Sequence, residues 1–138
     1  MTSLKSQTGS VGNRPRVLIV DDDDDVRTLI ESSLSHLGYP IAGSLSDGSD
    51  AVNFVSSNAD EVDLVLLDLV MKRLHGNVAL PILKSKKPDL KVIIISAFFM
   101  NYNTHFLANL GADGFLEKPF TLDELRQTLS KVLELSPR

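Results

Sequence analysis

The chain has 138 residues, 43% of them hydrophobic, and a formal charge of −4. This size and apolar content suit one domain with a real core, while the acidic balance argues against nucleic-acid binding, which needs clustered Lys and Arg. The absence of Cys excludes a disulfide framework and a thiolate metal site, and no apolar run approaches a membrane span. A reducing cytoplasm is the simplest location, with no membrane partner.

Short apolar runs alternate with stretches of helical spacing along the chain. Residues 1–14, rich in small polar residues around Thr8 to Asn13, are expected to be a disordered lead-in to a domain spanning 15–138. The expected strands span 17–20, 39–43, 62–67, 92–95 and 113–116. The expected helices span 26–37, 47–57, 77–86, 102–110 and 121–135.

Three of these strands contain four consecutive apolar residues, which are typical of strands buried on both faces of a parallel sheet. Five strands alternating with five helices predict an α/β fold: a doubly wound, flavodoxin-like parallel sheet with strand order 2-1-3-4-5.

Local signals mark several helix ends. Gly38 is expected to end the first helix, and Thr121 with Glu124 has the spacing of a capping box at the start of the last. Pro81 lies inside the third helical stretch, where it removes a backbone donor, so that helix is expected to begin late or to kink near Pro81.

Charged residues lie just after three of the expected strands. Asp21 and Asp22 follow the first, Asp68 follows the third and Lys118 follows the fifth. Parallel strands end at one edge of a sheet, so three carboxylates and one ammonium should meet there. An Asp carboxylate can attack a phosphoryl group if a divalent cation neutralises the oxygens, which predicts Asp68 as nucleophile and Asp21 and Asp22 as ligands of Mg²⁺ or Mn²⁺.

Each residue alone has a simpler interpretation. Acidic runs such as Asp21 to Asp25 commonly begin solvated helices, which suits Asp23 to Asp25, and a lone Asp at a strand end usually forms a turn. Their convergence on one sheet edge favours a site. Ser96, at the end of the fourth strand, adds a hydroxyl that could bind a phosphoryl oxygen or cap the next loop, and we favour the phosphate.

Four ordered blocks give the chain a family resemblance from about Arg16 to Leu135. The blocks are VLIVDD at 17–22, LLDLVM at 66–71, IISA at 94–97 and GADGFLEKPF at 111–120. The sequence resembles the receiver domain of two-component response regulators, as in chemotaxis-regulator-like proteins.

The resemblance implies a role for each matching residue. Asp68 would be the phosphoacceptor, and the backbone carbonyl of Val70 would join Asp21, Asp22 and Asp68 around the metal. Ser96 and Lys118 would bind phosphoryl oxygens, and the Lys118-Pro119 bond would be cis, as is typical of the family. Ser96 and Phe115 would form the switch that biases the face of the fourth helix, fifth strand and fifth helix.

The implied partners are a histidine kinase or histidine phosphotransfer protein as donor, and a downstream protein or a fused effector domain in a longer parent as output. The domain would catalyse only its own phosphorylation and dephosphorylation, as a signalling switch in a phosphorelay rather than an enzyme acting on other substrates. The sequence leaves open the cognate kinase, the signal, the oligomeric state and the lifetime of the phosphoryl group.

Some residues depart from the family pattern. Lys72 stands where Pro is usual, and the stretch from Phe98 to Tyr102, with Phe106 beyond it, is unusually aromatic and suits core packing or a docking surface. The three histidines, His36, His75 and His105, lie on separate expected elements and are interpreted as surface or structural residues.

Three other classes compete with a phosphorylated receiver. A haloacid-dehalogenase-like phosphatase would need a second Asp where Val70 stands, and a flavodoxin-type cofactor site would need glycines where Asp21 and Asp22 stand. A receiver-fold interaction module that is not phosphorylated is the main alternative.

Overall fold

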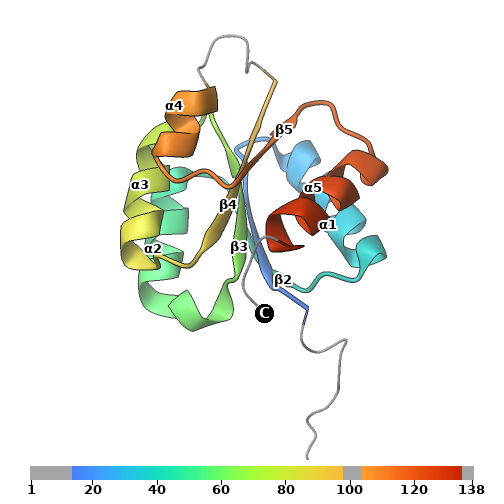
Figure 1. The fold of residues 1–138 in the computed structure, drawn as a ribbon, viewed down its shortest axis with the longest axis horizontal. Helices are drawn as coiled ribbons and strands as arrows, with labels where there is room; N and C mark the ends of the chain where they lie inside the picture. The colour runs from blue at the N-terminus through green and yellow to red at the C-terminus, as the bar shows by residue number, and fades with distance from the viewer. Residues whose placement is uncertain (1–13, 98–103, 135–138) are drawn as a thin grey trace, which may run out of the picture.

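The computed structural model describes residues 14–97 and 104–134, with only the backbone described for residue 134. It contains one five-stranded parallel sheet (Figure 1). The strands are β1 (Val17–Val20), β2 (Ile41–Leu45), β3 (Leu64–Asp68), β4 (Lys91–Ser96) and β5 (Gly114–Glu117). Their order is β2-β1-β3-β4-β5, which confirms the predicted flavodoxin-like topology. The expected lead-in, apart from residue 14, lies outside the described residues, and the 15–138 boundary stays a prediction.

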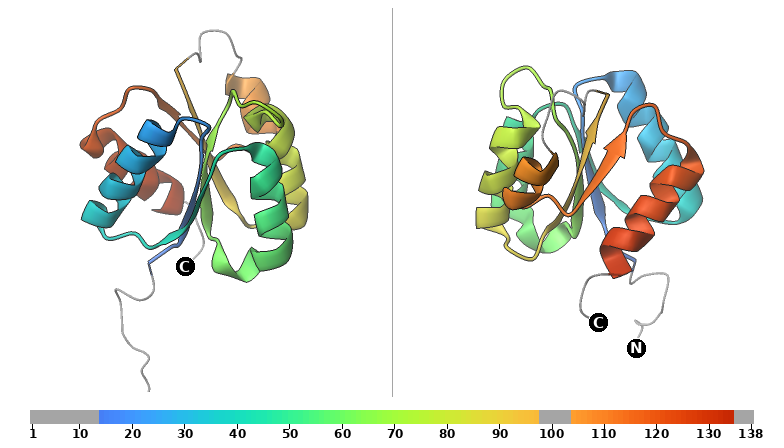
Figure 2. Two further views of the ribbon diagram at one scale, coloured as in Figure 1. Left: turned by 180° about the vertical axis from the view of Figure 1, so that it is seen from behind. Right: turned by 45° about the horizontal axis from the view of Figure 1, so that its top comes forward.

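Helices cover both faces of the sheet. They are α1 (Asp24–Leu37), α2 (Gly48–Asn58), α3 (Gly76–Lys86), α4 (Thr104–Asn109) and α5 (Leu122–Glu134), with a 3-10 turn, η2 (Ala59–Glu61). Figures 1 and 2 show α1 and α5 on one face and α2, α3 and α4 on the other. Within the described ranges, no helix combines the length and apolarity needed to cross a bilayer.

The predicted helix caps are present. The Asp23 side chain accepts from the backbone N–H of Asp25 and Val26 at the start of α1, and Gly38 ends that helix with φ 86°. At α5, Thr121 Oγ1 accepts from Glu124 N at 3.0 Å while Glu124 Oε1 accepts from Thr121 N at 2.9 Å. The capping-box prediction is therefore confirmed.

One strand boundary was predicted wrongly, and one of the two expectations for the third helix is excluded. The second strand begins at Ile41 rather than Tyr39, because Pro40 precedes it and Tyr39 is buried in the core beside α1. The third helix, predicted at 77–86, spans Gly76–Lys86 and includes Pro81, so the expected late start is excluded, while the alternative of a kink near Pro81 stays a prediction. Ala79, Leu80 and Leu83 on that helix are fully buried, and their burial outweighs the one backbone donor that proline removes.

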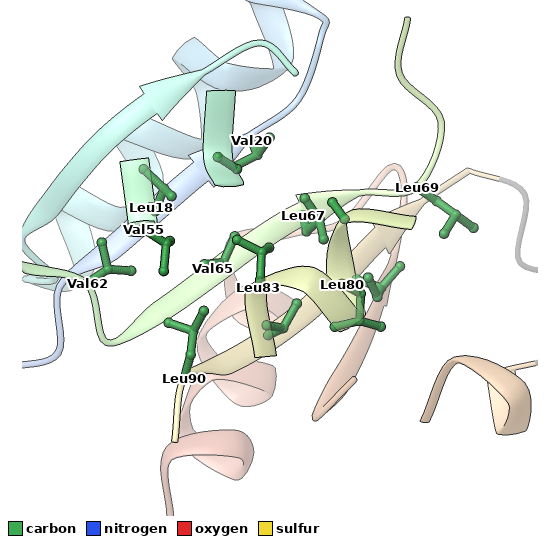
Figure 3. Close-up of a cluster of buried hydrophobic side chains, with 14 of the residues drawn as sticks. Leu18, Val20, Val55, Val62, Val65, Leu67, Leu69, Leu80, Leu83 and Leu90 are labelled. Atoms are coloured by element: carbon green, nitrogen blue, oxygen red, sulfur yellow. The ribbon is translucent and has the colours of Figure 1, made fainter. Parts of the chain in front are cut away.

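The core lies in two layers, one on each side of the sheet, as the continuous apolar strands predict. Under α2 and α3, β3 residues Val65 and Leu67 contribute to the same cluster as Leu80 and Leu83 of α3 (Figure 3). On the other face, β1 and β3 pack against Ile30 and Leu34 of α1 and against α5. Burial on both faces fixes the strands and therefore the position of the residues that follow them.

The aromatic stretch from Phe98 to Tyr102 lies outside the described residues. Phe106 is in α4, and its side chain is 54% exposed. The predicted helix at 102–110 is observed from Thr104 to Asn109, with residues 102 and 103 also outside the described ranges.

Candidate functional site

Three aspartates gather at the carboxyl edge of the sheet, at the top of Figure 1. The register pairs Val20 of β1 with Leu67 of β3, so Asp21 and Asp68, the next residue on each, come level. One carboxylate oxygen from each of Asp21, Asp22 and Asp68 lies within 4.8 Å of the others. Strand pairing thus sets Asp21 level with Asp68, and Asp22 joins them from the loop after β1 to complete the predicted acidic group.

Lys118 completes this group from the end of β5. It follows β5, its bond to Pro119 is cis, and its backbone N–H donates to Ser96 O at 2.9 Å. Its Nζ lies 2.6 Å from Asp21 Oδ2 and 3.3 Å from Asp68 Oδ1. The predicted cluster of three carboxylates and one ammonium is therefore present.

The charge of Asp68 is poorly compensated. Its side chain is buried, and this burial, together with the negative charge of Asp21, raises its pKa from an ordinary 3.8 to about 6 despite the nearby Lys118 ammonium. For Lys118, burial opposes the charged form, but close contact with Asp21 and the charge of Asp68 outweigh it and raise its pKa. At neutral pH the Lys118 ammonium is protonated. Asp68 is ionised, although its surroundings disfavour the negative charge.

The hydrogen bonds of the Asp21 carboxylate indicate whether the group suits a metal ion. Its Oδ1 accepts from Asp23 N at 2.9 Å. Its Oδ2 is buried and, although Lys118 Nζ is 2.6 Å away, accepts no well-directed hydrogen bond within the described part of the chain. A buried carboxylate oxygen of this kind, beside two further carboxylates, fits a hard divalent cation.

Ser96 and Phe115 lie close to this edge. Ser96 is the last residue of β4 and 2% exposed; Ile95 beside it pairs with Asp68. Phe115 is in β5, partly buried against the core layer under α3. The switching role of both residues stays a prediction.

The loop after β3 carries Val70 and Lys72. The Val70 side chain is 45% exposed, Met71 is buried and Lys72 is exposed. Val70 follows Asp68 by two residues in this loop, and its carbonyl as a metal contact remains a prediction.

Asp47, which precedes α2, fixes this loop by hydrogen bonds. The sequence alone did not predict this role. It caps α2 by accepting from Ser49 N at 2.9 Å, and it also accepts from Arg73 N at 2.8 Å and Leu74 N at 3.1 Å. Burial opposes its charge, but these donors lower its pKa to about 2. An Asp preceding a helix signals a cap, but its bonds to residues 26 and 27 positions later have no local signature.

An apolar hollow of about 300 Å³ opens beside Lys118. It is lined by α1 residues Val26, Leu29 and Ile30, by Ala97, and by Lys118, Pro119 and Phe120. Leu29 is 62% exposed at its rim. One flank of the acidic site is thus apolar surface open to solvent.

Sequence comparison gives a family match over most of the chain. The response regulator receiver domain pattern matches residues 17–130. The sensor kinase CckA of Brucella abortus is 36% identical over 86% of this chain and 12% of its own length. The response regulator MprA of Mycolicibacterium vanbaalenii is 36% identical over 86% of this chain and 50% of its own length. The chain spans half or less of these relatives.

Solved structures show the same fold. A chain in the CheX-CheY-BeF3-Mg²⁺ complex from Borrelia burgdorferi matches with a TM-score of 0.82 and 26% identity, over 86% of this chain and 88% of that one. The receiver domain of sensor histidine kinase PA1611 from Pseudomonas aeruginosa, with magnesium coordinated in its active site cleft, matches with a TM-score of 0.76 and 25% identity, over 88% and 98%. This chain belongs to the response regulator receiver domain family.

Proposed function

We propose that this domain accepts a phosphoryl group on Asp68 from a phosphohistidine of a histidine kinase or histidine phosphotransfer protein. The observation that carries the proposal is the position of Asp68, whose carboxylate lies among Asp21, Asp22 and the Lys118 ammonium. A buried carboxylate with a raised pKa, beside acids and a fixed cation, is typical of a reactive site.

Mg²⁺ or Mn²⁺ would be held by Asp21, Asp22 and Asp68 together with the Val70 carbonyl. Three carboxylates and one ammonium carry a net charge of −2, so a divalent cation would balance the group. When bound, the cation supplies neutralisation and orientation of the phosphoryl oxygens. The magnesium in the cleft of the PA1611 receiver domain supports this assignment by analogy.

In the transfer, an Asp68 carboxylate oxygen attacks the phosphorus of the phosphoimidazole. The new O–P bond forms as the N–P bond breaks, and the imidazole leaves with the electron pair and takes up a proton. Lys118, kept protonated by its acidic neighbours, holds a phosphoryl oxygen as charge redistributes. The hydroxyl of Ser96 donates to another oxygen of the phosphorylated product.

The output would be a shift in protein binding. The hydrogen bond between Ser96 and the phosphoryl group biases Ser96, Phe115 and the face of α4, β5 and α5 toward one arrangement. The signal would pass to a downstream protein or to an effector domain fused in a longer parent. The second possibility is favoured because the match covers only 50% of the length of MprA. We place this switch in the cytoplasm and assign it neither nucleic-acid nor membrane binding, as the composition predicts.

The test is phosphoryl incorporation measured by intact mass. Protein incubated with Mg²⁺ and a small acyl phosphate should gain one phosphoryl group that hydroxylamine removes, because the product is an acyl phosphate. Asp68→Asn should gain none, whereas Asp89→Asn, which removes an exposed acid in the turn between α3 and β4, should behave as the parent.

Failure of the parent to gain mass with several donors would support the alternative function, a receiver-fold interaction module that is not phosphorylated. Mass gain by Asp68→Asn equal to that of the parent would instead place the acceptor on another residue.

A further inference from the structure

The loop between β3 and α3, residues 69–75, is fixed at both ends. At its start, Leu69 N donates to Ile95 O at 3.1 Å, and Leu69 O accepts from Gly76 N at 2.9 Å. A Cβ on Gly76 would lie 2.3 Å from Asp68 O, so only glycine lets α3 begin this close to the strand. The first turn of α3 is therefore held against the backbone of Asp68.

His75 occupies the N-cap position of this turn. Its carbonyl accepts from Ala79 N at 2.9 Å, but its side chain makes no capping hydrogen bond. The imidazole turns back along the loop instead, and Nδ1 accepts from Met71 N at 3.0 Å. An accepting Nδ1 carries no proton, so the neutral ring is protonated on Nε2.

The peptide group that His75 holds is the one that contains the Val70 carbonyl. Met71 N–H and Val70 C=O belong to a single planar unit, and in a trans peptide they point in opposite directions. A hydrogen bond that fixes the direction of the N–H therefore also fixes the direction of the carbonyl, away from the imidazole.

We infer that His75 is a positioning residue that orients and polarises the Val70 carbonyl for the divalent cation. The inference rests on the proposed function, because that function makes the carbonyl a metal contact. Removing a group that hydrogen-bonds to a metal ligand typically weakens metal binding by about tenfold or more, because the ligand is then no longer oriented before the metal binds.

The decisive variants differ in whether residue 75 can accept a hydrogen bond. His75→Asn places Oδ1 close to where Nδ1 lies, whereas His75→Leu has similar bulk and no acceptor. His36→Leu is the matched control, because it removes an exposed histidine in the last turn of α1, about 20 Å along that helix from the site.

Two measurements separate positioning from simple folding effects. In metal-free protein, NMR should show faster hydrogen exchange of the Met71 amide in His75→Leu than in the parent or His75→Asn. Calorimetric titration with MgCl₂ should show about tenfold weaker binding by His75→Leu, and binding within about twofold of the parent for His75→Asn and His36→Leu.

Equal Mg²⁺ affinity of His75→Leu and the parent would overturn this inference. Mg²⁺ binding by His75→Asn as weak as that by His75→Leu would also overturn it. Neither result would affect the proposed phosphoacceptor. If the parent itself bound no Mg²⁺, the metal site would fail and this inference with it. Should His75→Leu not fold, His75→Ala gives the same comparison with a smaller side chain.

Discussion

Asp47 and Asp68 are both buried aspartates at the carboxyl edge of the sheet, one after β2 and the other at the end of β3. Asp47 is surrounded by donors from Ser49, Arg73 and Leu74, and its pKa falls to about 2. Asp68 lies beside other acids with Lys118 at 3.3 Å, and its pKa rises to about 6. Both side chains are shielded from solvent, but Asp47 accepts several hydrogen bonds whereas Asp68 lies deeper in the protein and beside a second carboxylate; these differences separate a structural acid from a reactive one.

Removing the donor-rich acid should have the largest effect on stability. Asp47→Ala leaves partly buried N–H groups of α2 and the β3–α3 loop without their acceptor, and we expect a loss of roughly 4 kcal/mol in the free energy of unfolding. Urea denaturation of the metal-free protein measures it. Asp50→Ala, which removes a more exposed acid 3.6 Å from Arg73, should cost less than about 1 kcal/mol. Equal losses would remove the distinction between donor-rich and ordinary acids.

The two acids should act on stability in separate pH ranges. Asp47 has a folded pKa below its ordinary 3.8, so its contribution is present above that pH and is lost as the pH falls toward 2. Asp68 has a folded pKa above 3.8, so its ionisation lowers stability by about 3 kcal/mol as the pH rises from about 4 to above 6.

This effect of Asp68 is measured as the difference in unfolding free energy between the parent and Asp68→Asn across that range in metal-free buffer. The difference should grow with pH and level off above pH 6. A constant difference from pH 4 to 7 would contradict the raised pKa.

Replacing the donor-poor acid should stabilise the fold. At neutral pH without metal, Asp68→Asn removes a buried charge while Lys118 keeps Asp21 at 2.6 Å, and we expect a gain of about 2 kcal/mol. Chemical denaturation gives the value, with Asp123→Asn, at an exposed acid of α5, as a control near zero. Destabilisation by Asp68→Asn would mean that the carboxylate contributes to the fold rather than being held at a cost to it.

Much of the site could be predicted because it depends on local patterns and a general rule of topology. Asp21, Asp22, Asp68 and Lys118 each lie at or just after the end of a strand, and parallel strands end on one side of a sheet. Their grouping is therefore encoded in short segments. Their roles as acceptor, ligands and counter-charge remain predictions.

The sequence by itself determined which charged residues come at or after the ends of the apolar strands, and with them which side chains would meet. The tertiary structure alone decided how their surroundings treat them: that Asp47 receives donors from a distant loop, that His75 turns back to Met71, and that α3 continues through Pro81. The physical reason is that apolar periodicity is a property of neighbouring residues, whereas hydrogen bonds between side chains and remote backbone exist only after the layers have packed.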